Sequence, residues 1–355
     1  MHWGSFKLEF LPHLRACCLT KIRSTRSLMH TRIFGPTGRS FGEIGLGTWQ
    51  LGGDWGEVSE DTALATLRAA FDGGVTFFDT ADVYGAGRSE TIIGRFLRET
   101  PAARSKIFVA TKLGRLNWPN GFTRDQIRGF TEASLRRLGV DALDLTQTHC
   151  IPPDVLRRGE VFGWLDELKR EGKIRHYGAS VESMDEARFC VEHGGCVSLQ
   201  IIFNLFRQKP IHELFAAARA KNIALIVRLP LASGLLGGKI TKQTAFATSD
   251  HRLYNRDGQC FNVGETFAGL PFAKGVELAD ALRPFVPAGW TMADLALRWC
   301  LDFDAVSVLI PGAKNPEQAR ANLRAASLPP LGAETHVKLA AFYERAVAAH
   351  IRGAY

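Results

Sequence analysis

The stretch FFDTADVYGAGRSE, residues 77–90, begins as a buried strand and runs into the start of a helix. Its apolar part stops at a carboxylate, Asp79, and five positions later a phenol, Tyr84, lies on a glycine-rich loop. Such an acid can simply cap a turn. In a sheet of parallel strands, however, the carboxyl end of a strand is also where active sites form. The pattern of the remaining chain decides between these two roles for Asp79.

The same strand–loop–helix pattern repeats along the chain. Helical patterns of apolar residues follow short apolar runs, and Thr123 with Gln126 forms a capping-box signature. Strands that alternate with helices predict a parallel sheet, and eight such units predict a closed (β/α)8 TIM barrel. An open doubly wound sheet is disfavoured because GLGTWQ, residues 45–50, lacks the third glycine of the dinucleotide fingerprint. The expected strands are 44–49, 75–79, 106–112, 142–149, 173–180, 196–201, 223–229 and 305–310, and the expected helices are 60–71, 89–98, 123–138, 159–171, 184–193, 211–220, 278–282, 292–301 and 316–326.

Two segments depart from this rhythm. Residues 1–28 hold five Lys or Arg and one acid, and we expect an N-terminal extension that is disordered or a start-site artefact ahead of Met29, with a transit peptide as the alternative. Residues 29–355 form the predicted barrel domain. The long segment 232–274 after the seventh strand is aromatic and mixed in charge, which predicts an ordered lid.

Composition disfavours several classes of function. The net charge is +8, but without residues 1–28 the chain has 39 basic and 35 acidic residues, or +4, and no basic stripe indicates nucleic-acid binding. No apolar run approaches the roughly 18 residues of a membrane helix. The seven cysteines are scattered without metal-ligand spacing. We therefore expect a cytoplasmic protein with no metal site and no membrane span. The sequence does not indicate its oligomeric state.

Four ionisable residues fall at the carboxyl ends of neighbouring expected strands. Asp79 ends the second strand, Lys112 the third and His149 the fourth, and Tyr84 lies on the loop after the second. Each has a structural alternative: a turn cap, a surface lysine, a buried histidine or a packing tyrosine. It is less plausible that all four reach one edge of one sheet by chance.

The motifs FFDTADVYG, VATKLG and LTQTH resemble those of the aldo-keto reductase superfamily, as do GLGTW, RLPLASGLLGGK and IPGAKNPEQARANL. The resemblance spans about residues 31–350. Within the superfamily, the chain is most similar to bacterial NADP-dependent members related to potassium-channel β subunits. It implies that Asp79, Tyr84, Lys112 and His149 form a catalytic tetrad. Tyr84 is then the proton donor, Lys112 lowers the pKa of its phenol, Asp79 holds Lys112, and neutral His149 orients the substrate oxygen.

The resemblance also implies an NADPH site. Ser180 and Gln200 are expected to contact the nicotinamide amide, although Val181 stands where the family commonly has Asn. Arg228 is expected to stack on the ring, and its alternative is a charge paired within the barrel mouth. The loop Pro230–Lys239 is expected to follow the pyrophosphate. The complete expected cofactor set is Gly47, Thr48, Asp79, Ser180, Gln200, Arg228, Pro230, Leu231, Ser233, Leu235, Lys239, Gly312, Lys314, Gln318 and Asn322.

Trp49, Tyr84, Trp118 and His149 are the expected walls of the substrate pocket, and either tryptophan can instead be a loop anchor. The resulting hypothesis is an NADPH-dependent reductase of small aldehydes and ketones. An NADPH-binding regulatory or redox-sensing subunit with slow turnover is the alternative, and a barrel isomerase or lyase acting on a phosphorylated substrate is a third.

Overall fold

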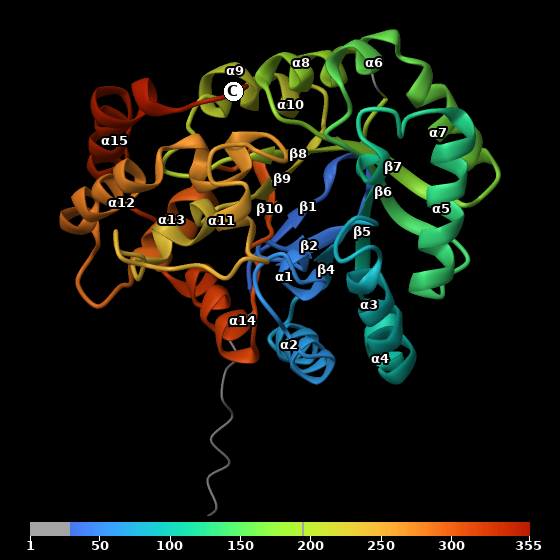
Figure 1. Ribbon diagram of the computed structural model, residues 1–355, viewed down its shortest axis with the longest axis horizontal. Coiled ribbons are helices and arrows are strands. Elements are labelled where there is room, and N and C mark those ends of the chain that lie inside the picture. The colour runs from blue at the N-terminus through green and yellow to red at the C-terminus, as the bar shows by residue number, and fades with distance from the viewer. Residues whose placement is uncertain (1–28, 194) are drawn as a thin grey trace, which may run out of the picture.

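Eight parallel strands form the centre of the computed structural model, which describes residues 29–193 and 195–355. The expected extension 1–28 lies outside the described residues. Each strand pairs with its neighbours in chain order, and parallel bridges from Ile44 to Leu309 and from Gly47 to Gly312 join the first strand to the last. The predicted closed barrel is confirmed, with a ring of helices around the strands (Figure 1). Its strands are β3 (Leu46–Gly47), β4 (Phe77–Asp79), β5 (Phe108–Leu113), β6 (Leu143–His149), β7 (Ile174–Ser180), β8 (Ser198–Ile202), β9 (Ala224–Arg228) and β10 (Val306–Leu309).

Most of the expected helices begin within one residue of the predicted position, but the helix expected at 278–282 begins six residues earlier, as α12. The hydroxyl of Ser59 caps α2, and Thr123 with Gln126 forms the expected capping box of α5. The single helix expected at 211–220 is wrong, because Leu214 leaves helical geometry at φ −132° and divides it in two. The α-helices are α1 (Trp49–Gly52), α2 (Glu60–Asp72), α3 (Arg88–Glu99), α4 (Pro101–Arg104), α5 (Arg124–Leu138), α6 (Pro153–Arg158), α7 (Glu160–Arg170), α8 (Met184–His193), α9 (Pro210–Glu213), α10 (Phe215–Ala220), α11 (His251–Tyr254), α12 (Phe272–Ala281), α13 (Met292–Leu301), α14 (Pro316–Leu323) and α15 (Ala333–Phe342).

The amino-terminal end of the barrel is closed by an antiparallel hairpin, β1 (Thr31–Ile33) and β2 (Ser40–Gly42), which the sequence patterns do not predict. Phe34 and Phe41 of this hairpin pack on Phe77 and Phe108 of the barrel, with ring centroids 4.9–5.8 Å apart. All four rings are almost fully buried. Aromatic side chains therefore fill the half of the barrel interior at the amino-terminal ends of the strands, which we term the lower half. The upper half, at the carboxyl ends of the strands, is left for polar groups.

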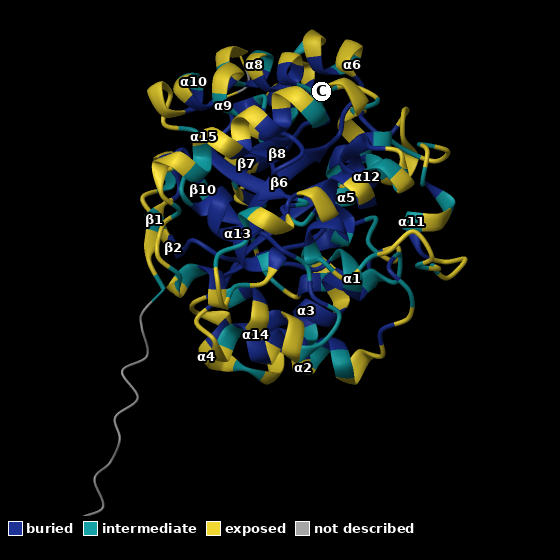
Figure 2. Cartoon of the chain, turned by 90° about the vertical axis from the view of Figure 1, so that its left-hand side faces the viewer, coloured by how far each residue is buried: buried dark blue, intermediate teal, exposed yellow. Residues whose placement is uncertain are grey.

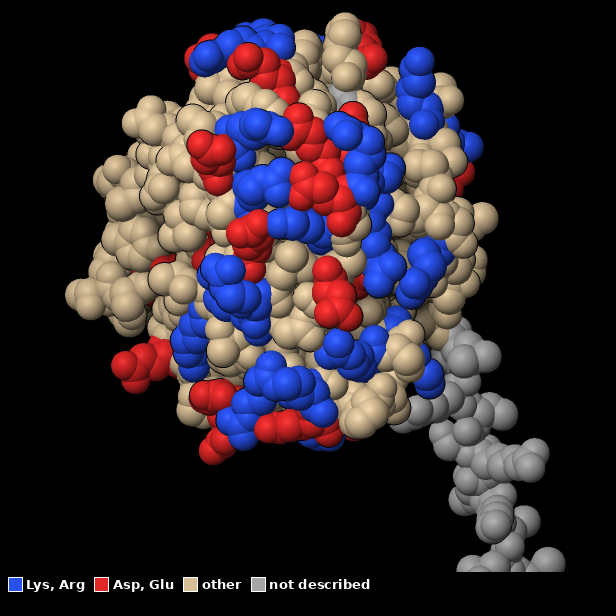
Figure 3. All heavy atoms as spheres, turned by 90° about the vertical axis from the view of Figure 1, so that its right-hand side faces the viewer, with Lys and Arg blue, Asp and Glu red and all other residues tan. Residues whose placement is uncertain are grey.

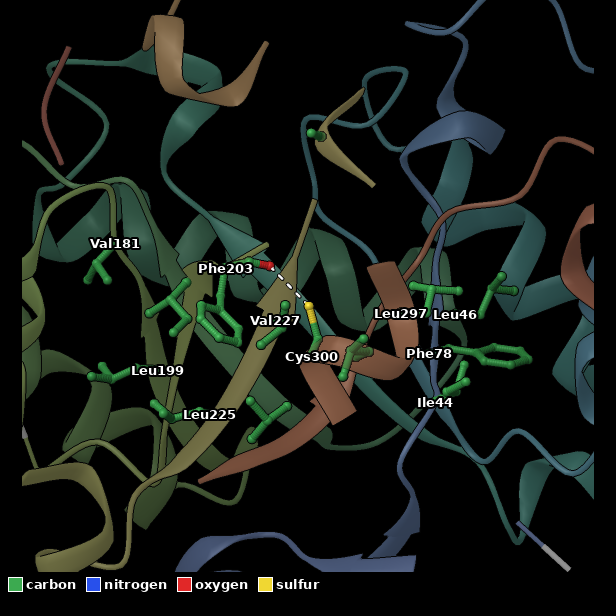
Figure 4. Packing of buried hydrophobic residues seen from close by; sticks show 14 of the residues in the cluster. Ile44, Leu46, Phe78, Val181, Leu199, Phe203, Leu225, Val227, Leu297 and Cys300 are labelled. Atoms are coloured by element: carbon green, nitrogen blue, oxygen red, sulfur yellow. Dashed lines mark hydrogen bonds between the residues drawn. The ribbon is translucent and has the colours of Figure 1, made fainter. Parts of the chain in front are cut away.

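A second apolar layer lies between the outer face of the strands and the helices. Leu199 and Leu225 belong to the same buried cluster as Val227, Phe203 and Cys300. In Figure 4, Val227 of β9 lies between Phe203 and Cys300 of α13. Side chains alternate across a strand, so the neighbours of Leu199, Leu225 and Val227 point inward. Figure 2 shows the consequence: the barrel strands are mostly buried, whereas the helices are exposed on their outer faces.

Charges on the surface of the described chain are mixed in sign over the side shown in Figure 3. There α5 and α7 are joined by ion pairs from Arg124 to Glu167 (2.7 Å) and from Arg128 to Glu171 (2.6 Å). Within the described residues, no helix combines the length and hydrophobicity needed to cross a bilayer.

The segment after β9 is ordered, as expected for a lid, and includes α11 and three short 3₁₀ helices rather than one regular helix. The last residues of the chain lie against it. Arg352 donates from Nε to the carbonyl of Gly269 (2.9 Å) and from Nη2 to that of Leu270 (3.2 Å). The lid is thereby tied to the C-terminal tail on one side and faces the barrel mouth on the other.

Candidate active site

Inward-facing side chains become polar toward the carboxyl ends of the strands. On β4 the inward positions are Phe77 and then Asp79, and on β9 they are Ile226 and then Arg228. The register places His149 beside Ser180 and Ser180 beside Gln200 on adjoining strands. Side chains on one face of a strand are two residues apart, so the inward-facing residue that follows the apolar layer already belongs to the ionisable layer.

Lys112 is the centre of this polar layer and is fully buried. Its Nζ donates to Asp79 Oδ1 (2.6 Å), to the carbonyl of Thr80 (2.8 Å) and to the hydroxyl of Tyr84 (3.1 Å). Burial opposes its charge, but Asp79 and Tyr84 together raise the pKa of Lys112 above its ordinary value. Its three donors are therefore used by three oxygens, and the ammonium form is retained.

Asp79 is held from its other side by amides. Its Oδ2 accepts from Gln200 Nε2 (2.7 Å) and, more weakly, from Gln147 Nε2 (3.5 Å). The side chain of Thr48 donates to the carbonyl of Asp79 (2.8 Å). A buried carboxylate needs such partners, so the neighbours of Asp79 fix its orientation toward Lys112.

Tyr84 reaches the mouth from the loop after β4. Its ring stacks on Trp49, with centroids 5.8 Å apart, and meets His149 edge-on at 6.0 Å. We expected Lys112 to lower the pKa of this phenol. Instead, burial raises the pKa of Tyr84 above its ordinary value, and the Lys112 ammonium offsets only part of that rise. The expectation ignored the desolvation of the phenolate, which is the larger effect here.

His149 is electrically neutral in this environment. Burial and, next, the charge of Arg115 hold the pKa of His149 well below its ordinary value. Its Nε2 lies 3.4 Å from Arg115 Nη1, and its buried Nδ1 has no hydrogen-bond partner among the described residues. The imidazole can therefore orient an oxygen but does not carry a charge near neutral pH.

A cavity of about 700 Å³ opens above these groups. Of the expected cofactor and substrate residues, the following line it: Gly47, Thr48, Trp49, Asp79, Tyr84, His149, Gln200, Arg228, Pro230, Leu231, Ser233, Lys239, Gly312, Lys314, Gln318 and Asn322. Lys112, Ser180 and Leu235 are buried behind the lining.

Trp118 does not line the cavity, so the structure does not support it as a second wall. Its side chain is 57% exposed, and its indole donates to the carbonyl of Cys150 (3.2 Å). The additional aromatic walls are Trp55 from the loop after α1, and Tyr254 and Phe261 from the lid. The sequence showed that the lid is aromatic but not which of its rings turn toward the barrel.

The features expected of a nicotinamide-dinucleotide site have physical counterparts. The Ser180 hydroxyl is buried without a partner among the described residues, beside the cavity-lining Gln200, and is therefore a polar group that a bound amide would satisfy. In the loop after β9, Leu229, Ala232 and Ser233 have positive φ of 46–54° although none is glycine. Such strain concentrates at functional sites, and left-handed turns of this kind direct backbone amides toward anions. The residues present therefore fit the group that the sequence implies.

Lys314, Gln318 and Asn322 lie together at the other end of the cavity, which we term the α14 end. The backbone N–H of Lys314 donates to Gln318 Oε1 (2.8 Å), and its ammonium donates to the carbonyl of Trp55. Arg252, which the sequence patterns do not predict as a site residue, also lines the cavity and pairs through Nη2 with Asp250 (2.6 Å). Nothing in its local sequence marks it, because Arg252 comes near Lys314 only through tertiary folding.

The part of the cavity beside His149, which we term the substrate end, contains two further residues that the sequence patterns do not predict, Arg115 and Glu265. Arg115 Nη1 donates to Glu265 Oε1 (2.8 Å), and Arg228 Nη1 lies 3.3 Å from Glu265 Oε2. Although burial opposes it, these two guanidinium groups lower the pKa of Glu265 to about 2. Arg228 is thus a charge paired within the barrel mouth, while still lining the cavity where a ring would stack. Cys260, the exposed one of the five described cysteines, also lines the cavity.

Comparison with known proteins agrees with this arrangement. Residues 43–344 match the family model described as "Aldo/keto reductase family". The chain is 33% identical to the aldo-keto reductase YhdN of Bacillus subtilis, over 80% of this chain and 85% of that protein. It is 29% identical to the NADH-specific methylglyoxal reductase of Escherichia coli, over 83% of this chain and 92% of that protein.

Among solved structures, the glycerol dehydrogenase AKR11B4 of Gluconobacter oxydans superposes with a TM-score of 0.73 at 29% identity. The match covers 92% of this chain and 98% of that one. The barrel, its buried lysine–carboxylate pair and the family match over most of the sequence lead to one conclusion: this chain belongs to the aldo/keto reductase family of oxidoreductases, which use nicotinamide cofactors.

Proposed function

We propose that this protein is an NADPH-dependent reductase that converts aldehydes or ketones into alcohols, with Tyr84 as the proton donor. The observation that carries the proposal is the Lys112 ammonium, which contacts both the Asp79 carboxylate and the Tyr84 hydroxyl beneath a cavity of about 700 Å³. A carbonyl that accepts a hydride must also accept a proton, and this arrangement supplies one at the cavity floor.

The cofactor would supply the hydride, and the protein's part is to hold the two reactants in place. Ser180 and Gln200 would bind the nicotinamide amide, and Arg228 would lie against the ring. The loop Pro230–Lys239 would follow the pyrophosphate. Because Gln200 already donates to Asp79, its oxygen is the atom left for the amide nitrogen.

Each member of the tetrad has a separate task in the proton transfer. Tyr84 keeps its proton until the carbonyl oxygen gains negative charge, and then donates it. Lys112 stabilises the phenolate that remains, and Asp79 keeps Lys112 in position. Neutral His149 orients the carbonyl oxygen toward Tyr84 without competing as an acid.

The preference for NADPH is proposed from the α14 end. Lys314 and Arg252 both line it and can meet a 2′-phosphate, and Asn315 caps the beginning of α14, where backbone amides favour an anion. The family fold does not fix this choice, since the Escherichia coli relative is described as NADH-specific. Asp250 already pairs with Arg252, so we expect a preference of about ten- to a hundredfold rather than an absolute one.

A panel of methylglyoxal, nitrobenzaldehydes and glyceraldehyde tests the function, with NADPH or NADH consumption followed by absorbance. We expect turnover of several members, faster with NADPH. Tight NADPH binding with negligible turnover would favour the alternative of a regulatory subunit. Failure to bind either dinucleotide, measured by quenching of tryptophan fluorescence, would contradict both. We also propose a cytoplasmic location and a small carbonyl compound as the partner.

A further inference from the structure

Arg115 is the substrate-end residue whose hydrogen-bonding capacity is least used within the described chain. Only its Nη1 is engaged: it donates to Glu265 Oε1 (2.8 Å) and lies 3.4 Å from His149 Nε2 and 3.6 Å from Cys150 Sγ. Its Nε and Nη2 donate to no described group, neither atom is fully buried, and the residue lines the cavity. The open Nε–Nη2 edge is the planar fork that binds a carboxylate through two parallel hydrogen bonds.

The surroundings hold this fork rigidly. Phe261 from the lid lies over the guanidinium, 4.9 Å from its central carbon, and Glu265 anchors the opposite edge. The side chain is only 15% exposed. A guanidinium fixed on one face and one edge loses little freedom when a ligand binds the remaining edge.

The charge of the cluster suits a single negative charge. Arg115 and Arg228 are positive and share one carboxylate, Glu265. Glu182 lies against Glu265, and burial raises the pKa of Glu182 to about 7. The cluster therefore carries a net charge between zero and +1, and an arriving anion favours the protonated form of Glu182. A dianion such as a phosphate ester is less well matched.

A metal ion is the competing occupant. Cys150, Glu182 and Glu265 offer ligand atoms within 4.8 Å of one another. Both arginines, however, lie against Glu265 and within 3.7 Å of the thiol sulfur. A cation would have to displace two guanidinium groups, so the cluster repels a metal and attracts an anion.

We propose that Arg115 binds a carboxylate on the substrate, so that the preferred substrates are short carbonyl compounds that also carry one carboxylate group. The inference rests on the proposed reductase function. Its geometric reason is that Arg115 Nη1 lies 3.4 Å from His149 Nε2, the atom that would orient the carbonyl oxygen. One molecule can then place its carbonyl at His149 and Tyr84 and its carboxylate on the open edge of Arg115.

Matched pairs of aldehydes test this substrate class. Succinic semialdehyde is compared with butanal, and 4-carboxybenzaldehyde with benzaldehyde, in the full-length protein with NADPH. We expect the carboxylated member of at least one pair to have a kcat/KM about ten- to a hundredfold higher, mostly through KM. Arg115→Met should erase this ratio, because the kcat/KM of the carboxylated aldehydes should fall at least tenfold further than that of their neutral partners. Arg115→Lys, which keeps the charge but loses the fork, should restore part of it.

Arg124→Met is the matched control, because Arg124 is an exposed arginine paired with Glu167 outside the cavity; its ratio should equal that of the wild type. Binding provides a readout without turnover: titration calorimetry of the cofactor-free protein should show benzoate binding at least tenfold tighter than benzamide, a difference that Arg115→Met abolishes. Equal kcat/KM within both pairs, with neutral aldehydes still reduced, would overturn the inference and leave the reductase function intact. If no aldehyde is reduced, the reductase function fails, and equal binding of benzoate and benzamide then removes the carboxylate site as well.

Discussion

The two halves of the barrel interior are built by the same strands and have opposite character. Phe77 and Asp79, or Ile226 and Arg228, are neighbours on one face of one strand, yet the first of each pair is in the aromatic layer and the second in the charged one. Apolar burial stabilises a fold, whereas a buried ion pair contributes little net stability. The comparison teaches that the lower half holds the barrel together and the upper half carries its chemistry.

The largest difference between the effect on activity and the effect on stability is expected for Tyr84→Phe, which removes one oxygen from the upper half. Loss of a general acid should reduce kcat about a hundred- to ten-thousandfold. The ring still packs on Trp49, so the midpoint of thermal unfolding should hardly change. Steady-state kinetics and calorimetry measure the two quantities, and NADPH binding should be retained. A kcat close to that of the wild type would reject Tyr84 as the proton donor.

Phe77→Ala tests the lower half. This ring is fully buried and contacts Phe34, Phe41 and Phe108. Its removal should lower the free energy of unfolding by about 3–5 kcal/mol, measured by urea denaturation. The folded fraction should keep a normal KM for the carbonyl substrate. Phe77→Leu is the control, with a smaller loss; a loss below about 1 kcal/mol for the alanine variant would mean that the hairpin does not seal the barrel as described.

The pH dependence of stability should come partly from the lid above the upper half. Burial lowers the pKa of His251 to about 4. As the pH falls from 6.5 to 4, the unfolded chain takes up a proton on this side chain and the folded chain does not, so stability falls. The contribution is about 3 kcal/mol at pH 4. Urea titrations at pH 7 and pH 4 should show that His251→Gln loses less stability than the wild type; equal losses would exclude this histidine as the cause.

Lys314→Ala should give the smallest effect, at the edge of the upper half. It should raise KM for NADPH and leave that for NADH nearly unchanged, so that the ratio of kcat/KM values falls about ten- to a hundredfold. Arg320→Ala on α14 is the control, because Arg320 is exposed and pairs with Glu317. An unchanged ratio in Lys314→Ala would transfer the proposed phosphate contact to Arg252.

The repeated strand and helix patterns were sufficient to predict the barrel, because burial and periodicity are local properties of the sequence. The same patterns predicted that Asp79, Lys112 and His149 lie at one edge of the sheet, since parallel strands bring their carboxyl ends together. The hairpin β1–β2 was missed because its strands have only three residues each and lie outside the alternating units. The division between α9 and α10 was also missed, since Leu214 is an ordinary helix former.

The pairing of Arg115 with Glu265 could not be predicted. The two residues are 150 positions apart, one on the loop after β5 and the other in the lid. In the sequence, Arg115 looks like any solvent-exposed arginine. Similarly, charge alone predicts that Lys112 lowers the pKa of Tyr84, and only the structure shows how deeply the phenol is buried. Long-range contacts and desolvation are properties of the folded chain.

The position of Cys260 has a practical consequence. Cys150, Cys190, Cys196 and Cys300 are buried, whereas Cys260 is exposed on the lid and lines the cavity. Within the described chain, a maleimide dye therefore has one accessible thiol, beside the place where ligands enter. The protein thus carries a native attachment point for a fluorescent reporter, whose emission would record the arrival of cofactor or substrate in real time without an engineered cysteine.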